Sequence, residues 1–450
     1  MIVKKIEIEN YKGFEKQEIT FNDNLNVFIG ANASGKTSLL EVILKSLYDL
    51  VVKVNPDLKE VDRRLKFSQN EINYKYKGKY LGVICHIQPD NYPLLSVNLF
   101  RGHINSTWGN KYDNEEWNQL IDDFKKTLTQ PQTIPIIRYY PSEKNKIRNQ
   151  TPSKKTPLMY TVGQLETWDN IIQDYDFAYT EFVQWFYNYE TLELRLRRDK
   201  DDNSLEVPQL KYIRDAIQKA LYGIYGKKYL IKSNGEIAAG HFKLTPKLTI
   251  KSLNGTTDLE EDLTAKSDGE KAIITLVADI AYNLALAHDF EADENYLNSP
   301  GIVLIDEIEE HLHPNWQRKI IPILTSVFPK IQFFITTHSP QVISSVNSEH
   351  VFLCEDFKIG KVYLRTKGVD SNALLTFLFN STERPKEYID LVNKFDELID
   401  NDVDISELER IIEKVTKLEE EDTGSDISSL VSELELQLEA YKFELEHEMD

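Results

Sequence analysis

The feature that most constrains the fold is an eight-residue stretch, Gly30–Thr37, which lies between a short apolar run and a longer amphipathic run. The apolar run Leu25–Ile29 predicts a buried strand, and the run that begins at Lys36 predicts a helix. The stretch has the G-x-x-x-x-G-K-[ST] spacing of a phosphate-binding loop, in the strand–loop–helix context that gives this motif its meaning. An α/β fold is therefore predicted around this stretch.

The residue types of this loop predict that it binds a nucleoside triphosphate. Glycines let successive backbone N–H groups converge on phosphate oxygens, and the N-terminus of the following helix adds free donors. Lys36 is expected to reach the β- and γ-phosphates, and the Thr37 hydroxyl is expected to ligate Mg²⁺. The alternative is an ordinary glycine turn. The predicted nucleotide-binding residues of the loop are Gly30, Asn32, Ser34, Gly35, Lys36, Thr37 and Ser38.

Two later apolar runs end in residues that suit phosphate chemistry. The run Ile302–Ile305 ends in Asp306 and Glu307, and the run 331–337 ends in His338. Because ligands bind at the carboxyl ends of parallel strands, these side chains are expected near the loop. Asp306 is predicted to help bind Mg²⁺, Glu307 to polarise the attacking water, and His338 to hydrogen-bond the γ-phosphate. The alternative for the two acids is a pair of solvated loop residues.

Two other segments predict helices with apolar stripes. Residues 164–225 contain a dense aromatic cluster, which predicts the core of a helical subdomain or a contact with another subunit. Its members are Trp168, Tyr175, Phe177, Tyr179, Phe182, Trp185, Phe186, Tyr187 and Tyr189. Near the end of the chain, an apolar stripe either docks on its own domain or binds a partner or a second copy. Its members are Leu430, Leu434, Leu438, Tyr441 and Leu445.

Charge is distributed unevenly along the 450 residues. The net charge is −20, and residues 401–450 contribute −13 of it, which argues against a generally sticky nucleic-acid binder. One basic segment, 142–157, is predicted to be a mobile loop that either touches nucleic acid or is simply solvated. Its cations are Lys144, Lys146, Arg148, Lys154 and Lys155.

Cysteine usage and hydropathy bear on the compartment. Cys85 and Cys354 stand alone without metal-type spacing, and the first residues alternate like a strand rather than forming the apolar core of a signal peptide. No run approaches the length that crosses a bilayer. A cytoplasmic protein with no membrane partner is expected.

At this point the chain resembles a known superfamily, because four of its motifs match, in order, those of ABC-type ATPases. The branch that it resembles comprises RecF, SMC proteins and the overcoming-lysogenization-defect (OLD) nucleases. The resemblance covers roughly residues 1–50 and 265–365. The four motifs are the phosphate loop Gly30–Thr37, the signature Ser267–Glu270, the Walker B run Ile302–Glu307 and the switch histidine in Thr337–Ser339. The resemblance to the branch comes from the opening Ile8–Phe14 and from the run Asp306–Pro314.

The resemblance implies a site shared between two copies of the chain. In this superfamily the signature acts in trans, so Ser267 and Gly269 would contact the γ-phosphate of ATP held by the loop of the partner subunit. Asp268 and Glu270 complete the predicted signature, and the cofactors implied are ATP and Mg²⁺. At least a head-to-head homodimer is implied. One departure is Lys266, where the family often has an apolar residue.

The resemblance is most specific to Septu-type (PtuA-like) anti-phage defence ATPases, which also occur as effectors of some retrons. Residues 339–450 lack the metal cluster of an OLD nuclease, and SMC-type arms are absent. In such systems an ATPase works with a separate HNH nuclease, so ATP hydrolysis without nuclease activity is expected of this chain. The alternatives are a RecF-like repair or recombination ATPase that binds DNA directly through 142–157, and an ATP-sensing scaffold with little hydrolysis.

The predicted architecture is an α/β, ABC-type ATPase head with a mixed or parallel sheet flanked by helices, an inserted helical subdomain and a C-terminal helical tail. The expected bounds are 1–140 and 246–380 for the two parts of the head, 141–245 for the basic loop and aromatic-rich insertion, and 381–450 for the acidic tail.

Overall fold

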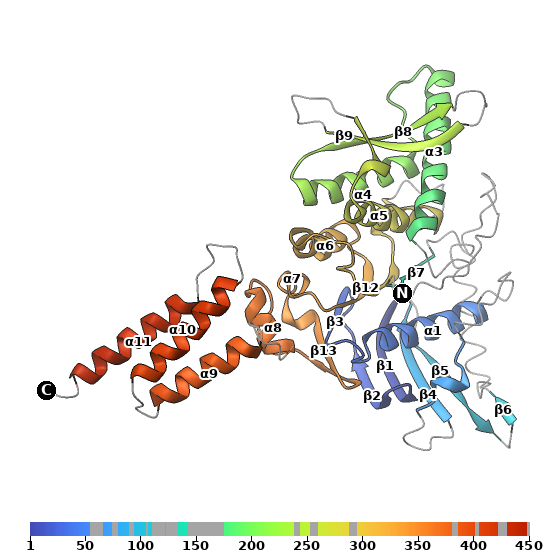
Figure 1. Cartoon of the computed structure of the whole chain (residues 1–450). Helices are drawn as coiled ribbons and strands as arrows, with labels where there is room; N and C mark the ends of the chain where they lie inside the picture. The colour runs from blue at the N-terminus through green and yellow to red at the C-terminus, as the bar shows by residue number, and fades with distance from the viewer. Residues whose placement is uncertain are drawn as a thin grey trace. The chain divides into compact units, whose positions relative to one another are not determined.

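The computed structural model divides the chain into two compact units, Met1–Leu374 and Leu375–Asp450 (Figure 1). The structure describes residues 1–54, 66–73, 80–89, 94–104, 107–109, 122, 134–142, 175–237, 244–252, 260–287, 295–379, 386–400, 405–421 and 430–447. Among these residues, no helix combines the length and the apolar character that crossing a membrane would require.

The first unit is built on a six-stranded sheet of order β14-β13-β3-β12-β11-β7. All neighbours in it are parallel except β13 and β14, which form an antiparallel hairpin. Every residue of β3, β7, β11 and β12 is buried, as expected for parallel strands covered on both faces. The strands are β3 (Leu25–Ile29), β7 (Ile136–Tyr140), β11 (Gly301–Ile305), β12 (Ile331–Thr337), β13 (Val351–Glu355) and β14 (Lys358–Lys361).

A second sheet, antiparallel and five-stranded, has the order β2-β1-β4-β5-β6. Helix α1 (Lys36–Val54) contacts β4 and β5 of this sheet and β12 of the larger sheet. One apolar core therefore joins the helix and the two sheets. Each large side chain fully buried there stabilises the fold by about 1.5–3 kcal/mol. The strands are β1 (Ile2–Tyr11), β2 (Phe14–Thr20), β4 (Tyr80–Gln88), β5 (Leu95–Ile104) and β6 (Thr107–Gly109).

Three helices and a small sheet form a further layer of the first unit (Figure 1). The helices are α3 (Tyr175–Lys200), α4 (Pro208–Tyr225) and α5 (Asp268–Ala287), and the strands, in sheet order, are β10 (Glu260–Asp262), β9 (Leu244–Ser252) and β8 (Tyr229–Ile237). Trp185 of α3 stacks on Tyr189 at 4.2 Å between ring centroids and meets Tyr282 of α5 edge-on at 5.2 Å. The described part of the predicted aromatic cluster therefore packs within its own chain.

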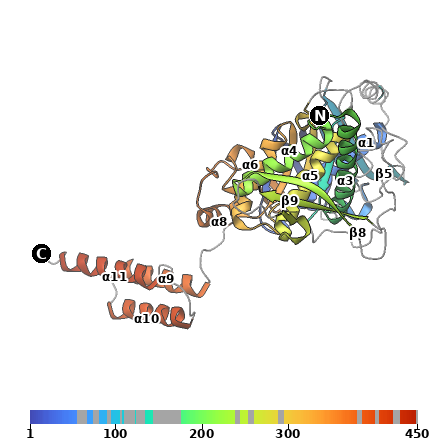
Figure 2. The same cartoon turned by 90° about the horizontal axis from the view of Figure 1, so that it is seen from above.

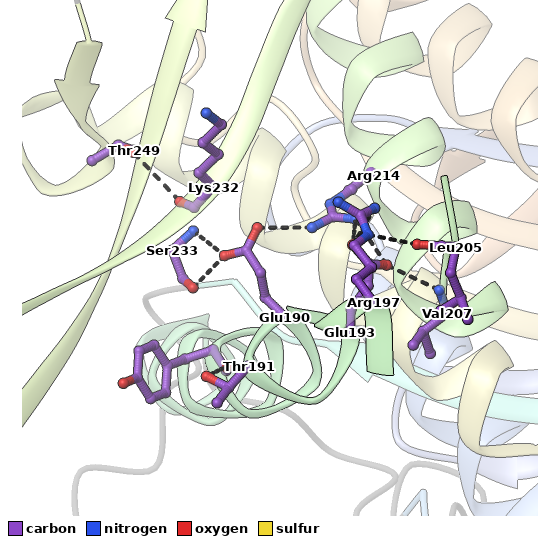
Figure 3. Close-up of polar contacts among 11 residues, drawn as sticks. Glu190, Thr191, Glu193, Arg197, Leu205, Val207, Arg214, Lys232, Ser233 and Thr249 are labelled. Atoms are coloured by element: carbon purple, nitrogen blue, oxygen red, sulfur yellow. Dashed lines mark hydrogen bonds and ion pairs between the residues drawn. The ribbon is translucent and has the colours of Figure 1, made fainter. Parts of the chain in front are cut away.

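An ionic cluster fixes α3 against α4 and β8 (Figure 3). Arg214 of α4 pairs with Glu190 at 2.7 Å and with Glu193 at 2.9 Å, and the Glu193 side chain is only 1% exposed. Glu190 also accepts the backbone N–H of Ser233 on β8 at 2.6 Å. Because the groups in this cluster are hydrogen-bonded to one another, it serves to hold the layer together rather than to bind a ligand.

Short elements complete the first unit and lead out of it. They are α6 (Pro314–Val327), α7 (Pro340–Ile343) and α8 (Ser371–Phe379), with 3-10 turns at Gln69–Glu71, Leu263–Ala265, Tyr296–Asn298 and Ser348–His350.

The second unit contains three helices that lie side by side in both views: α9 (Lys386–Asp400), α10 (Ile405–Glu421) and α11 (Leu430–His447) (Figures 1 and 2). Four members of the predicted stripe, Leu430, Leu434, Leu438 and Tyr441, are buried in their own bundle against Phe395, Leu408, Ile411 and Val415. The side chain of Leu445 lies outside the described residues. The stripe thus docks within its own unit, which was the first of its two interpretations.

The bundle offers a matched pair of leucines on α11. Leu434 is 1% exposed and Leu436 is 71% exposed. We expect Leu434→Ala to lower the free energy of unfolding of this unit by about 2–5 kcal/mol, because it leaves a cavity. Leu436→Ala should change it by less than about 0.5 kcal/mol. Urea unfolding of the full chain, followed by circular dichroism, measures both, and equal effects would contradict this packing.

Candidate functional site

The loop Gly30–Thr37 joins the end of β3 to the start of α1, where the sequence places it. Gly30 has φ 149° and Gly35 has φ 106°, both in the region that favours glycine. A Cβ on Gly30 would lie 2.1 Å from the Cys354 carbonyl oxygen, and one on Gly35 would lie 2.8 Å from the Phe357 ring. The two motif glycines are therefore required by the backbone and by β13 and the β13–β14 turn, which pack against the loop.

The interior of the loop carries a buried cation and a buried hydroxyl. Lys36 is 6% exposed, and its ammonium donates to the carbonyl oxygens of Gly30 at 2.7 Å and Ala31 at 2.8 Å. Burial lowers the pKa of Lys36, because the charged form loses hydration. Ser34 Oγ is buried, and within the part of the chain that the structure describes no polar atom hydrogen-bonds it. A buried cation beside an unsatisfied hydroxyl fits a polyanion such as a triphosphate. Asn32 is exposed and Ser38 is half-buried.

Thr37 and Asp306 meet at the same edge of the sheet. Thr37 Oγ1 lies 3.0 and 3.1 Å from the two Asp306 carboxylate oxygens. Asp306 is 3% exposed, and its backbone N–H donates to the Tyr140 carbonyl oxygen of β7 at 2.9 Å. Oxygen atoms of these two types are the ligands that Mg²⁺ prefers.

Glu307 and Asp306 are both fixed by a residue that sequence reasoning missed, Thr336 of β12. Its hydroxyl donates to Asp306 Oδ1 at 2.6 Å and accepts the Glu307 backbone N–H at 2.8 Å. Glu307 has φ 51°, in the left-handed region that non-glycine residues adopt infrequently. The two consecutive threonines that end the apolar run 331–337 are the only signal in the sequence for this contact.

His338 is paired with a second residue that was not assigned a role, Glu309. Its ring Nδ1 lies 2.9 Å from Glu309 Oε1, and its backbone N–H donates to the same oxygen at 2.7 Å. The hydrogen bond to Glu309 raises the pKa of His338. Burial by itself raises the pKa of Glu309, but the hydrogen bonds from His338, from the Thr337 side chain and from the Glu309 backbone together outweigh it, and the net shift is downward. The signal was the second Glu of the Asp-Glu-x-Glu run.

The predicted signature forms the start of α5. Ser267 and Glu270 form a capping box: the Ser267 N–H donates to Glu270 Oε2 at 2.9 Å, and the Glu270 N–H donates to Ser267 Oγ at 3.4 Å. A Cβ on Gly269 would lie 2.4 Å from the His311 carbonyl oxygen, so glycine is required there by the chain's own packing. The Asp268 side chain is 86% exposed. Within the described residues, the hydrogen bonds of Ser267 and Glu270 do not run to the phosphate loop. The role of the signature in trans stays a prediction.

A buried ionic network joins α5 to the sheet beside Asp306. Arg138 of β7 pairs with Asp279 of α5 at 2.8 Å, and both side chains are 3% exposed. Tyr140 Oη donates to Asp279 at 2.5 Å, and Asn283 Nδ2 donates to it at 3.1 Å. Because the Tyr140 carbonyl also holds the Asp306 N–H, the helix that starts at the signature is tied to the Walker B strand.

The turn between β13 and β14 supports the loop from the other side. Asp356 and Phe357 have φ 46° and 59°, and the Phe357 N–H donates to the Ser34 carbonyl oxygen at 3.1 Å. The Phe357 ring packs edge-on against Phe14 at 5.3 Å. The turn thus fixes the backbone of the phosphate loop at Ser34.

The basic segment 142–157 lies outside the described residues except for Ser142, which is buried. Its predicted contact with nucleic acid stays a prediction.

The strand order, the loop and the polar residues at the carboxyl ends of β11 and β12 define the class of the first unit, an ABC-type nucleotide-binding head. Residues 25–344 match the family described as "AAA domain, putative AbiEii toxin, Type IV TA system". The chain belongs to this family.

Individual relatives refine the comparison. The chain is 26% identical to "Retron Ec83 probable ATPase" of Escherichia coli, over 100% of this chain and 88% of that protein. It is 22% identical to "Septu protein PtuA" of Bacillus thuringiensis, over 93% of each. Among solved structures, the recombination mediator protein RecF has a TM-score of 0.41 and 14% identity, over 80% of this chain and 98% of that one. The resemblance to the ATPase branch linked to retrons and Septu is confirmed.

Gly30 of the loop and Gly360 of β14 give a test of the loop geometry. We expect Gly30→Ala to weaken nucleotide binding about tenfold or more, because its Cβ would collide with a backbone carbonyl and distort the loop. Gly360→Ala is the control, since nothing lies within 4 Å of a Cβ on this β14 residue. Titration with a fluorescent ATP analogue measures both, and unchanged binding by Gly30→Ala would refute the loop geometry.

Proposed function

We propose that the chain is the ATP-binding and ATP-hydrolysing subunit of a bacterial anti-phage defence complex. The observation that carries this proposal is the convergence of Lys36, Asp306, Glu307 and His338 at one edge of the sheet, at the carboxyl ends of β3, β11 and β12. The names of the retron and Septu relatives support the biological setting.

The loop binds the phosphates, and the end of the Walker B strand, together with Thr37, binds Mg²⁺. Lys36 and the loop N–H groups bind the β- and γ-phosphates, and a bound anion replaces the carbonyl oxygens that now accept from the Lys36 ammonium. Thr37 and Asp306 fit a Mg²⁺ site, since their oxygens converge and Thr336 fixes the carboxylate. When bound, Mg²⁺ neutralises charge on the β- and γ-phosphate oxygens.

Glu307 and His338 serve the transfer step. Glu307 polarises the attacking water and accepts its proton, and its unusual backbone conformation is held by Thr336. His338 hydrogen-bonds the γ-phosphate, where negative charge must be stabilised in the transition state.

The site is completed by a second copy of the chain. Ser267 and Gly269 of one copy contact the γ-phosphate bound by the other, so that ATP lies between two heads. Supporting this, Ser267 is exposed immediately before the start of α5, where a second copy can reach it. The assembled ATPase then regulates or positions a separate HNH-type nuclease.

Replacement of Glu307 separates binding from hydrolysis. We expect Glu307→Gln to lower the rate of phosphate release from ATP about 10²-fold or more, because the amide cannot accept the proton of the water. Binding of ATP should be retained, whereas Lys36→Ala should lose it. Phosphate release and nucleotide titration measure the two effects. Equally negligible hydrolysis by the wild type and Glu307→Gln would instead support an ATP-sensing scaffold.

Mixing two inactive variants tests the shared site. Lys36→Ala lacks a working loop and Ser267→Arg lacks a working signature, so each alone should be inactive. A mixed dimer contains one intact site, and an equal mixture should recover about a quarter of the wild-type phosphate release if two-fold related copies exchange freely. Ser267→Arg should still bind ATP, which reports that it is folded. No recovery in the mixture would argue that the signature acts within its own chain or not at all.

A further inference from the structure

Glu309 is a buried carboxylate that the proposed reaction does not yet use. It lies three residues after Asp306, in the turn where the Leu312 N–H donates to its carbonyl oxygen at 3.0 Å. Its side chain is 6% exposed. One carboxylate oxygen, Oε1, accepts from both the ring and the backbone of His338, at 2.9 and 2.7 Å. The other oxygen, Oε2, is buried, and no polar atom of the described residues lies within hydrogen-bond distance of it.

A carboxylate buried in this way favours a cation beside it. Removing an ionised carboxylate from water costs several kcal/mol unless an opposite charge and hydrogen bonds offset the loss. Glu309 is hydrogen-bonded by the His338 backbone N–H, by the Thr337 side chain and by the His338 imidazole, and of these three groups only the imidazole can carry a positive charge. The imidazole is 45% exposed at the other end of the pair. The pair therefore has a buried acid and a histidine that reaches the surface of the site.

The geometry also determines which ring nitrogen of His338 can donate a hydrogen bond to the phosphate. Because a carboxylate only accepts hydrogen bonds, Nδ1 of His338 must carry the proton that it donates to Glu309. In a neutral imidazole, Nε2 would then have a lone pair and could only repel phosphate oxygens. Only the imidazolium offers an Nε2–H donor while Nδ1 stays bonded to Glu309.

We propose that Glu309 is a positioning residue that holds His338 as an imidazolium, with Nδ1 bound to the carboxylate and Nε2–H left for the phosphate. This inference rests on the ATP-hydrolysing function proposed above and assigns the two glutamates of the Asp-Glu-x-Glu run different tasks. Glu307 polarises the attacking water, and Glu309 keeps His338 protonated.

The charges around His338 agree with this assignment. The hydrogen bond to Glu309 is the largest influence on the pKa of His338 and raises it; partial burial lowers it, Glu307 raises it and Lys36 lowers it. The net direction is upward. The donor form is thus present below the raised pKa and is lost as pH rises through it.

The test compares pH–rate profiles of ATP hydrolysis for the full-length protein and Glu309→Gln. The amide oxygen still accepts from Nδ1, so ring orientation is kept while the charge is removed. We expect the alkaline limb of the profile to move to lower pH by about one unit or more. Near pH 8 turnover should fall about tenfold with ATP binding unchanged, and it should recover toward pH 6. Glu310→Gln removes the same charge one residue away and should leave the limb in place.

Two outcomes overturn the inference. An unshifted limb in Glu309→Gln shows that the carboxylate does not govern the protonation of His338. An equal loss of activity at every pH, with a lowered melting temperature, shows that Glu309 acts only through stability.

Titration of His338 by NMR tests its pairing with Glu309 without measuring ATP hydrolysis. The imidazole ¹³Cε1 resonance of His338, assigned by its loss in His338→Gln, should titrate at higher pH in the wild type than in Glu309→Gln. Identical titration in the two proteins overturns the inference. If the wild type fails to hydrolyse ATP while the two titrations differ, the proposed function fails and the pairing of Glu309 with His338 stands.

Discussion

The site depends on the position of β12 between β3 and β11. Parallel pairing aligns Thr337 with Ile29 on one side and Ile335 with Ile305 on the other, so the phosphate loop and the Walker B acids emerge at the same edge. The Thr336 hydroxyl then reaches Asp306 at 2.6 Å and the Glu307 N–H at 2.8 Å. A shift of one residue in this register would turn Thr336 to the other face of the sheet and break both hydrogen bonds, to the Asp306 carboxylate and to the Glu307 backbone N–H. One hydroxyl in the correct register thus holds the carboxylate that we propose for Mg²⁺ and the backbone of the residue that we propose for the water.

The same edge is tied to the helical layer by charge rather than by apolar packing alone. Tyr140 accepts the Asp306 N–H through its carbonyl and bonds Asp279 through its hydroxyl, beside the buried Arg138–Asp279 pair. Removing one partner of a buried pair leaves an uncompensated charge, which costs about 3–5 kcal/mol. The start of α5 is therefore held at a defined place relative to the Walker B strand. The proposed contact of these first residues with a second subunit would need such a fixed position.

The sequence predicted the strand ends and the loop well, because both leave local signals. Apolar runs that stop at Asp306 and His338 identify the carboxyl ends of buried strands, and motif spacing identifies Lys36. Thr336, Glu309 and the Arg138–Asp279 pair were not predicted, since each contact joins residues far apart in the chain and depends on register and helix packing. The α11 stripe shows the same limit. Its spacing predicts an apolar helix face, but only the structure identifies Phe395 and Leu408 as what covers that face.

The capping box at the start of α5 and the proposed contact with a partner's γ-phosphate would both use the Ser267 hydroxyl. In this structure Ser267 Oγ donates to Glu270 Oε2 at 2.8 Å, and the capping box so formed starts α5. To bind a partner's γ-phosphate, Ser267 would have to turn that donor away from Glu270. Glu270 loses little by this exchange, because it keeps the Ser267 N–H at 2.9 Å and the Tyr225 hydroxyl. Because Tyr225 belongs to α4, its bond to Glu270 would keep the start of α5 anchored while the Ser267 hydroxyl turns from Glu270 to the phosphate. A capping box with a second donor to its glutamate can therefore release its serine to a ligand without unwinding the helix.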